Sequence, residues 1–140
     1  MTPKQIILIK NSWKVLKIID TALVGDVFYS RLFLEMPSLR NLFNSKMTDQ
    51  YSKLINMLSY IVSKIDDLTE INEQLADLAI RHVTYGVRPS HYAIVGKTLL
   101  WTLEKGLGKD WNNELNDAWT LCYGTISQTM IHAAYPNEEI

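Results

Sequence analysis

Prolines and glycines break this sequence into apolar segments of unequal length, and this feature constrains the fold more than any other. Between the breaks, apolar residues recur three and four positions apart, as on a buried helical face, and no alternation typical of strands persists. One segment is very short, so a bundle of four equal helices fits poorly. We therefore expect an all-α protein with six to eight helices, over residues 3–19, 21–35, 37–43, 48–65, 72–85, 89–107 and 111–134.

Side chains that cap helices support several of these boundaries. Thr2 and Gln5 flank Pro3 in the pattern of a capping box, in which each side chain bonds the backbone N–H group of the other residue. Thr48 is the predicted cap of the fourth helix, and Gly86 is predicted to end the fifth in the left-handed conformation. The remaining connections are mostly short, as in a compact helical domain.

Composition and charge exclude several classes of function. The 140 residues suffice for one domain with its own core, spanning residues 1–140. The net charge of −1 provides no basic surface for nucleic acid or for an anionic membrane. No apolar run reaches about 18 residues and no signal-peptide pattern opens the chain, so we expect a cytoplasmic protein, either a monomer or a weak dimer.

The single cysteine and the three histidines limit the possible metal chemistry. Cys122 can form no disulfide within the chain, and the Cys-x-x-Cys-His motif of covalently attached haem is missing. His82, His91 and His132 are not spaced for a two-histidine zinc site. Motifs for nucleotide phosphates and for a serine nucleophile are also absent from the sequence.

His82 is the histidine with the most informative surroundings. It follows Leu78 and Ala79 by one turn, which places it on the apolar face of its predicted helix. A lone histidine on such a face is more often a core residue than a ligand, so periodicity alone leaves both interpretations open.

Two polar residues, Tyr29 and Gln50, are candidates for a ligand pocket. Gln50 shares a helix face with Leu54, about 6 Å away along the axis. Tyr29 lies on the helix before Pro37. A tyrosine and a glutamine that converge on an apolar site could donate hydrogen bonds to a small ligand, although each could equally be a core or a solvated residue.

Five segments of the sequence resemble helical motifs of bacterial globins, in the same order. Residues 81–96 (Arg-His-Val-Thr-Tyr-Gly-Val-Arg-Pro-Ser-His-Tyr-Ala-Ile-Val-Gly) are the most specific and resemble the segment joining the F and G helices. The other segments resemble parts of the B, C, E and H helices and are residues 28–33, 37–43, 49–54 and 118–124. The chain as a whole resembles the flavohaemoglobin and single-domain bacterial haemoglobin class.

This resemblance implies a globin fold around non-covalent haem b, with His82 as the proximal iron ligand. Phe43 would pack on the haem face, Tyr29 and Gln50 would form the distal polar pair, and Leu54 would form the distal wall. The residues implied to line the rest of the pocket are Tyr92, Val87, Val95, Leu99 and Tyr123. We expect the backbone carbonyl near Leu78 to fix the orientation of the imidazole.

The resemblance implies reversible binding of O₂, NO or CO as the function, with two alternatives. One is a nitric oxide dioxygenase that uses an external reductase, since we expect no flavin or nicotinamide domain in this protein. The other is a haem-based gas sensor or a haem-free interaction module. Ala134 stands where the class has a glutamate that polarises the proximal histidine, which favours ligand binding over redox catalysis. Coordination of ferric iron by Tyr29 or Gln50 stays open.

Overall fold

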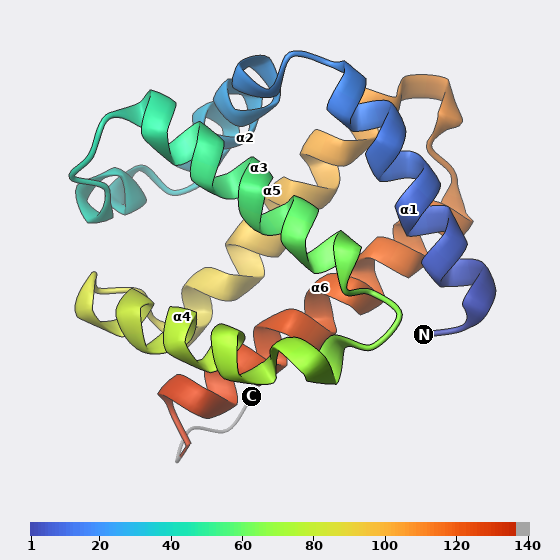
Figure 1. Cartoon of the computed structure of the whole chain (residues 1–140). Coiled ribbons are helices and arrows are strands. Elements are labelled where there is room, and N and C mark those ends of the chain that lie inside the picture. The colour runs from blue at the N-terminus through green and yellow to red at the C-terminus, as the bar shows by residue number, and fades with distance from the viewer. Residues whose placement is uncertain (137–140) are drawn as a thin grey trace.

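The computed structural model describes residues 1–136, and within them the chain forms helices and no strands (Figure 1). Six α-helices and three short 3-10 helices make up this described part. In chain order they are α1 (Pro3–Ile18), α2 (Thr21–Glu35), η1 (Pro37–Leu42), α3 (Met47–Ser63), η2 (Leu68–Ile71), α4 (Asn72–Thr84), α5 (Pro89–Leu107), η3 (Gly108–Asp110) and α6 (Asn113–Ala134). The prediction of an all-α fold is confirmed.

Most helix ends fall within one residue of the predicted boundaries, and the end of α3 and the start of α6 differ by two residues. The capping box at the start of α1 is present, with Gln5 N–H donating to Thr2 Oγ1 at 3.1 Å. The prediction that Thr48 caps α3 is wrong, because the helix starts at Met47, and Thr48 lies inside its first turn. The last helix begins later than expected, after Asn112, whose side chain caps it.

Buried apolar side chains from all six α-helices form the core, within which α1 and α5 pack against α6. The rings of Trp13 and Trp119 lie 6.2 Å apart in this core, and each indole N–H donates to a serine hydroxyl. Trp119 donates to Ser12 Oγ at 3.0 Å, so no donor is lost when the indole is buried. Cys122 is also buried here, and burial raises the pKa of its thiol to about 12.

A close crossing of α2 and α3 forms another part of the molecule. A Cβ atom at Gly25 would lie 2.5 Å from Tyr51 Cβ, so only glycine allows this approach. The helices α3 and α4 are joined through η2, and they diverge from that turn (Figure 1). They are not among the helix pairs that pack closely, since α3 contacts α1 and α2, while α4 contacts α6 and η2.

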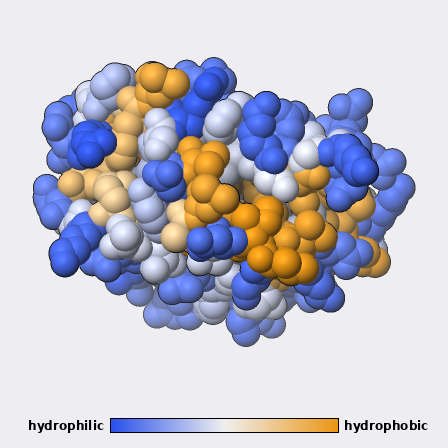
Figure 2. All heavy atoms as spheres, turned by 90° about the horizontal axis from the view of Figure 1, so that it is seen from above, coloured by the Kyte–Doolittle hydropathy of each residue, from blue (hydrophilic) through white to orange (hydrophobic). Residues whose placement is uncertain are grey.

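Apolar side chains also gather on one face of the surface (Figure 2). The most exposed large apolar side chains in the described residues are Ile18, which is 86% exposed, and Leu34, which is 71% exposed. No helix within residues 1–136 is both long enough and apolar enough to cross a membrane.

Candidate functional site

His82 lies in the last turn of α4, and the turn after it fixes that end of the helix. Gly86 adopts a positive φ of 96°, which favours glycine. Its N–H donates to the Val83 carbonyl at 3.0 Å, and the Val87 N–H donates to the His82 carbonyl at 3.0 Å. This pair of bonds is a Schellman motif, which confirms the predicted left-handed cap at Gly86.

The His82 imidazole is half-buried and keeps an unused nitrogen. Its Nδ1 is the one buried side-chain nitrogen or oxygen in residues 1–136 that lacks a hydrogen-bond partner. Burial lowers the pKa of the ring and Arg81 lowers it further, while the Leu78 backbone carbonyl opposes them. That carbonyl is thus close enough to act on the ring, as expected, but the geometry falls short of a proper hydrogen bond. The ring is therefore neutral near pH 7, the form that binds metal ions.

The predicted proximal residues come together where α5 packs on α6. Tyr92 and Leu99 are buried, and Val87 and Val95 are half-buried against the same core. The Tyr123 hydroxyl donates to the Tyr92 backbone carbonyl at 2.6 Å. Burial raises the pKa of Tyr92 to about 12, with a smaller effect from Tyr135, so the Tyr92 phenol stays uncharged.

On the distal side, Tyr29 is packed edge-on by two phenylalanines. The ring of Phe28 lies 4.9 Å away and that of Phe43 lies 5.4 Å away, both close to perpendicular. Each such pair contributes about 0.5–1.5 kcal/mol beyond the area it buries. The structure thus brings together two of the predicted pocket residues, Tyr29 and Phe43. Burial raises the pKa of Tyr29 to about 12, and its hydroxyl has no hydrogen-bond partner among the described residues.

Gln50 and Leu54 lie one turn apart in α3, and both are half-buried. The Gln50 amide donates to Ser45 Oγ in the segment before the helix. The Gln50 amide is thus engaged within its own segment, and no hydrogen bond joins Gln50 to Tyr29 in residues 1–136. Tyr51, the next residue, instead stacks on Tyr29 with 5.8 Å between ring centroids. Its hydroxyl bonds Asp26 at 3.1 Å.

The predicted site residues therefore form two groups. The distal group lies on α2, directly after η1 and on α3, and the proximal group lies on α4, α5 and α6 and in the turn before α5. The two sets of helices contact each other where α2 packs on α5. Sequence reasoning missed Tyr135, whose hydroxyl donates to the Val87 carbonyl. Only its place directly after a long helix could have drawn attention to it.

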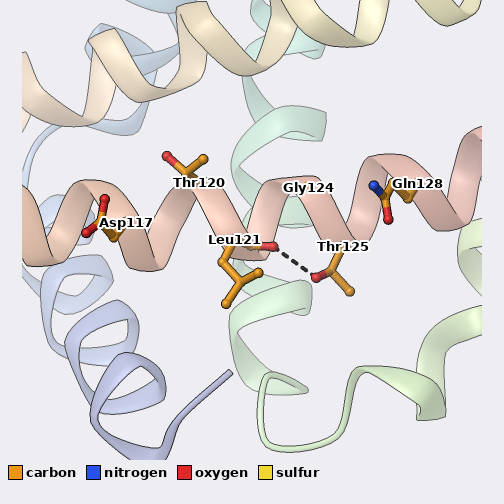
Figure 3. Close-up of a pocket in the computed structure, with 6 residues that line it drawn as sticks. All are labelled: Asp117, Thr120, Leu121, Gly124, Thr125 and Gln128. Atoms are coloured by element: carbon orange, nitrogen blue, oxygen red, sulfur yellow. Dashed lines mark hydrogen bonds between the residues drawn. The ribbon is translucent and has the colours of Figure 1, made fainter. Parts of the chain in front are cut away.

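A surface groove runs along α6, away from these residues (Figure 3). It is formed by one helix alone, and the Thr125 hydroxyl in it bonds the Leu121 carbonyl at 2.9 Å. None of the predicted site residues lines it. The described residues also contain no cluster of three or more metal-binding side chains. His82 is a half-buried histidine of this part of the chain, and its pKa is lowered by burial. A neutral imidazole of this kind is chemically able to bind a metal ion.

Comparison with known proteins agrees with this fold. The sequence profile of the globin family matches residues 26–130. The flavohemoprotein of Bordetella pertussis is 35% identical over 134 residues, which cover 94% of this chain and 33% of that protein. The chain thus spans about one third of the length of this curated relative.

Two solved structures share the fold over almost the whole chain. A bacterial globin from Campylobacter jejuni superposes with a TM-score of 0.83 at 25% identity, covering 96% of this chain and 97% of that one. A hexacoordinated heme protein from an anhydrobiotic tardigrade gives a TM-score of 0.85 at 16% identity, covering 96% and 95% of the two chains. Family membership implies a haem cofactor, and the chain belongs to the globin family.

Proposed function

We propose that this protein binds haem b non-covalently through His82 and reversibly binds a diatomic gas, O₂, NO or CO. The observation that carries the proposal is the neutral, half-buried imidazole of His82, whose ring lies close to the Leu78 carbonyl and whose Nε2 forms no hydrogen bond with any described residue. A neutral imidazole held on one side by a backbone carbonyl keeps its other nitrogen available for a metal ion. When bound, haem would supply an iron atom that accepts the gas.

The apolar residues of both groups would hold the haem and exclude water. Phe43 and Leu54 would cover it from the distal side, and Val87, Val95 and Leu99 from the proximal side. All five belong to the core cluster or pack directly against it, so they lose little side-chain entropy on binding. Removing water also protects the gas site from competing reactions.

Tyr29 would act as the hydrogen-bond donor to the gas. Its hydroxyl stays protonated near neutral pH because its pKa is about 12, and no described residue uses it. Gln50 would have to leave Ser45 before its amide could donate. We therefore assign the main distal contact to Tyr29 and a secondary one to Gln50.

The proximal side favours reversible binding over nitric oxide dioxygenase chemistry. Ala134, at the end of α6, has only a methyl group where a carboxylate could have polarised His82. Tyr92 and Tyr123, which the resemblance assigns to the haem pocket, are neutral phenols, because burial raises the pKa of both. Neither can supply the negative charge that pushes electron density onto iron.

Replacement of His82 by glycine tests the proposal. We expect His82→Gly to lose haem to a competing acceptor more than about tenfold faster than the parent, and free imidazole to restore the ferrous spectrum. The matched control is His132→Gly, which changes an exposed histidine on α6 and should leave both unchanged. If His82→Gly kept the parent five-coordinate ferrous spectrum without imidazole, the assignment of the iron ligand would be wrong.

A further inference from the structure

The end of α6 is fastened to the turn between α4 and α5. Tyr135 follows the last residue of α6, and its backbone N–H donates to the Ile131 carbonyl at 2.7 Å. This bond fixes the main chain of Tyr135 to the helix. Its hydroxyl then crosses to the Val87 carbonyl, 48 residues earlier in the sequence. The Tyr135 side chain thus joins the end of α6 to the turn between α4 and α5.

The peptide groups of Val87 are held on two sides. The Val87 carbonyl accepts from Tyr135, and the Val87 N–H donates to the His82 carbonyl at 3.0 Å. Tyr135 and His82 are therefore connected through the hydrogen bond of the Tyr135 hydroxyl to Val87, the Val87 residue itself, and the backbone hydrogen bond from Val87 to His82. Few torsions are free along such a path, so a displacement of Tyr135 would move the last turn of α4.

We propose that Tyr135 is a positioning residue for His82, one that orients the imidazole through the Val87 backbone without adding charge. The inference rests on the proposed role of His82 as the iron ligand. Ala134, the preceding residue, cannot serve because its methyl group makes no hydrogen bond. A hydroxyl bonded to a backbone carbonyl fixes where the helix ends, but it leaves the electron density of the ring unchanged.

A second tyrosine on α6 supports this arrangement. Tyr123 donates to the Tyr92 carbonyl, so α6 bonds the main chain on both sides of Pro89, the first residue of α5. The two bonds together fix the start of α5 and the turn before it. Tyr135 is the member of the pair whose bond leads to His82.

The Tyr135→Phe variant is expected to fold. The side chain is half-buried and lines a surface hollow with Val83, Arg88 and Pro89, so loss of the hydroxyl leaves a site that water can reach. The matched control is Tyr60→Phe, which removes a half-buried tyrosine hydroxyl from α3, a helix that bonds neither Val87 nor His82.

Amide hydrogen exchange in the full chain measures how strongly the bond from Tyr135 to Val87 holds this turn. We expect the Val87 amide to exchange about three- to tenfold faster in Tyr135→Phe, which corresponds to the loss of one hydrogen bond. Amides in the middle of α4 should keep their rates. This measurement does not depend on what His82 binds.

The haem-loaded protein tests the positioning role. In Tyr135→Phe we expect the iron–histidine stretching band of the ferrous form to shift and broaden, and haem loss to accelerate about three- to tenfold. Tyr60→Phe should reproduce the parent in both measurements. An unmoved band together with an unchanged rate of haem loss would overturn the inference. The separate His82→Gly experiment would still decide the proposed function.

Discussion

The two sides of the candidate haem site are held by different forces. On the distal side, Tyr29 is fixed by the rings around it and by the close crossing of α2 and α3, and its hydroxyl stays unused. On the proximal side, tyrosine hydroxyls bond the backbone at Val87 and Tyr92. Ring packing holds a position while leaving a polar atom available, whereas hydrogen bonds to the backbone hold a helix end. The first arrangement suits a hydrogen-bond donor that meets an arriving ligand, and the second suits a residue that stays bound to a cofactor.

The largest expected effect comes from adding one methyl group at the α2–α3 crossing. We expect Gly25→Ala to lower the free energy of unfolding by about 1–3 kcal/mol, because the new Cβ would lie 2.5 Å from Tyr51 Cβ, next to the backbone. Chemical denaturation of the full chain measures this. Gly124→Ala is the control, since its Cβ would meet nothing within 4 Å and should stabilise α6 by about 0.5–1 kcal/mol.

Gly96→Ala makes the corresponding change on the proximal side. Its Cβ would lie 2.5 Å from Tyr123 Cε2, at the edge of a ring that can tilt away. We expect a smaller loss than for Gly25→Ala. If Gly96→Ala cost more, the distal side would not be the one held by close packing, and the contrast between the two sides would fail.

The next largest effect concerns the free hydroxyl of Tyr29. We expect Tyr29→Phe to speed O₂ dissociation about tenfold, the value of one hydrogen bond of about 1.4 kcal/mol. Stopped-flow measurement on the haem-loaded protein gives the rate. Tyr51→Phe is the matched control, because that hydroxyl already bonds Asp26, and its rate should stay within about twofold of the parent. Equal rates in Tyr29→Phe and the parent would remove Tyr29 from the distal role.

The smallest effect is a pH dependence on the proximal side. His91 Nδ1 accepts from the Arg88 N–H at 3.0 Å, which requires a neutral ring, and burial followed by Arg88 lowers the pKa of His91. The folded pKa thus lies below the unfolded value of about 6.5. Stability is therefore complete above about pH 6.5 and falls as the pH drops through that value toward the folded pKa.

His91→Gln isolates this contribution, because glutamine can accept the same bond but does not titrate. We expect the parent to lose stability relative to His91→Gln between about pH 6.5 and 5, by less than about 1 kcal/mol since the cap is largely exposed. Thermal unfolding at a series of pH values measures the difference. Parallel curves for the two proteins would show that His91 has no part in it.

Local signals in the sequence were enough to predict much of the helical framework. The bounds of α2 and α5 agree with the prediction because proline, glycine and apolar spacing act within a few residues. The left-handed cap at Gly86 was predictable for the same reason. The 3-10 helix η2 was missed, since four residues are too few to show a period.

The candidate site could be predicted only in part. The globin resemblance assigns Tyr29 and Phe43 to the same pocket without predicting a contact between them, and in the structure their ring centroids lie 5.4 Å apart. The bond of Tyr135 to Val87 joins residues 48 positions apart, and no local pattern encodes such a contact. The bond of Gln50 to Ser45 depends on a choice among side-chain rotamers, which residue type alone does not decide.

The burial of Cys122 has a consequence for a protein proposed to meet reactive gases. Nitrosation and oxidation of cysteine proceed mainly through the thiolate, and a thiol with a pKa of about 12 in a closed core offers almost none at neutral pH. The only sulfhydryl of the chain is therefore almost unreactive while the core is closed. The rate at which Cys122 reacts with a thiol reagent would then measure how often that core opens.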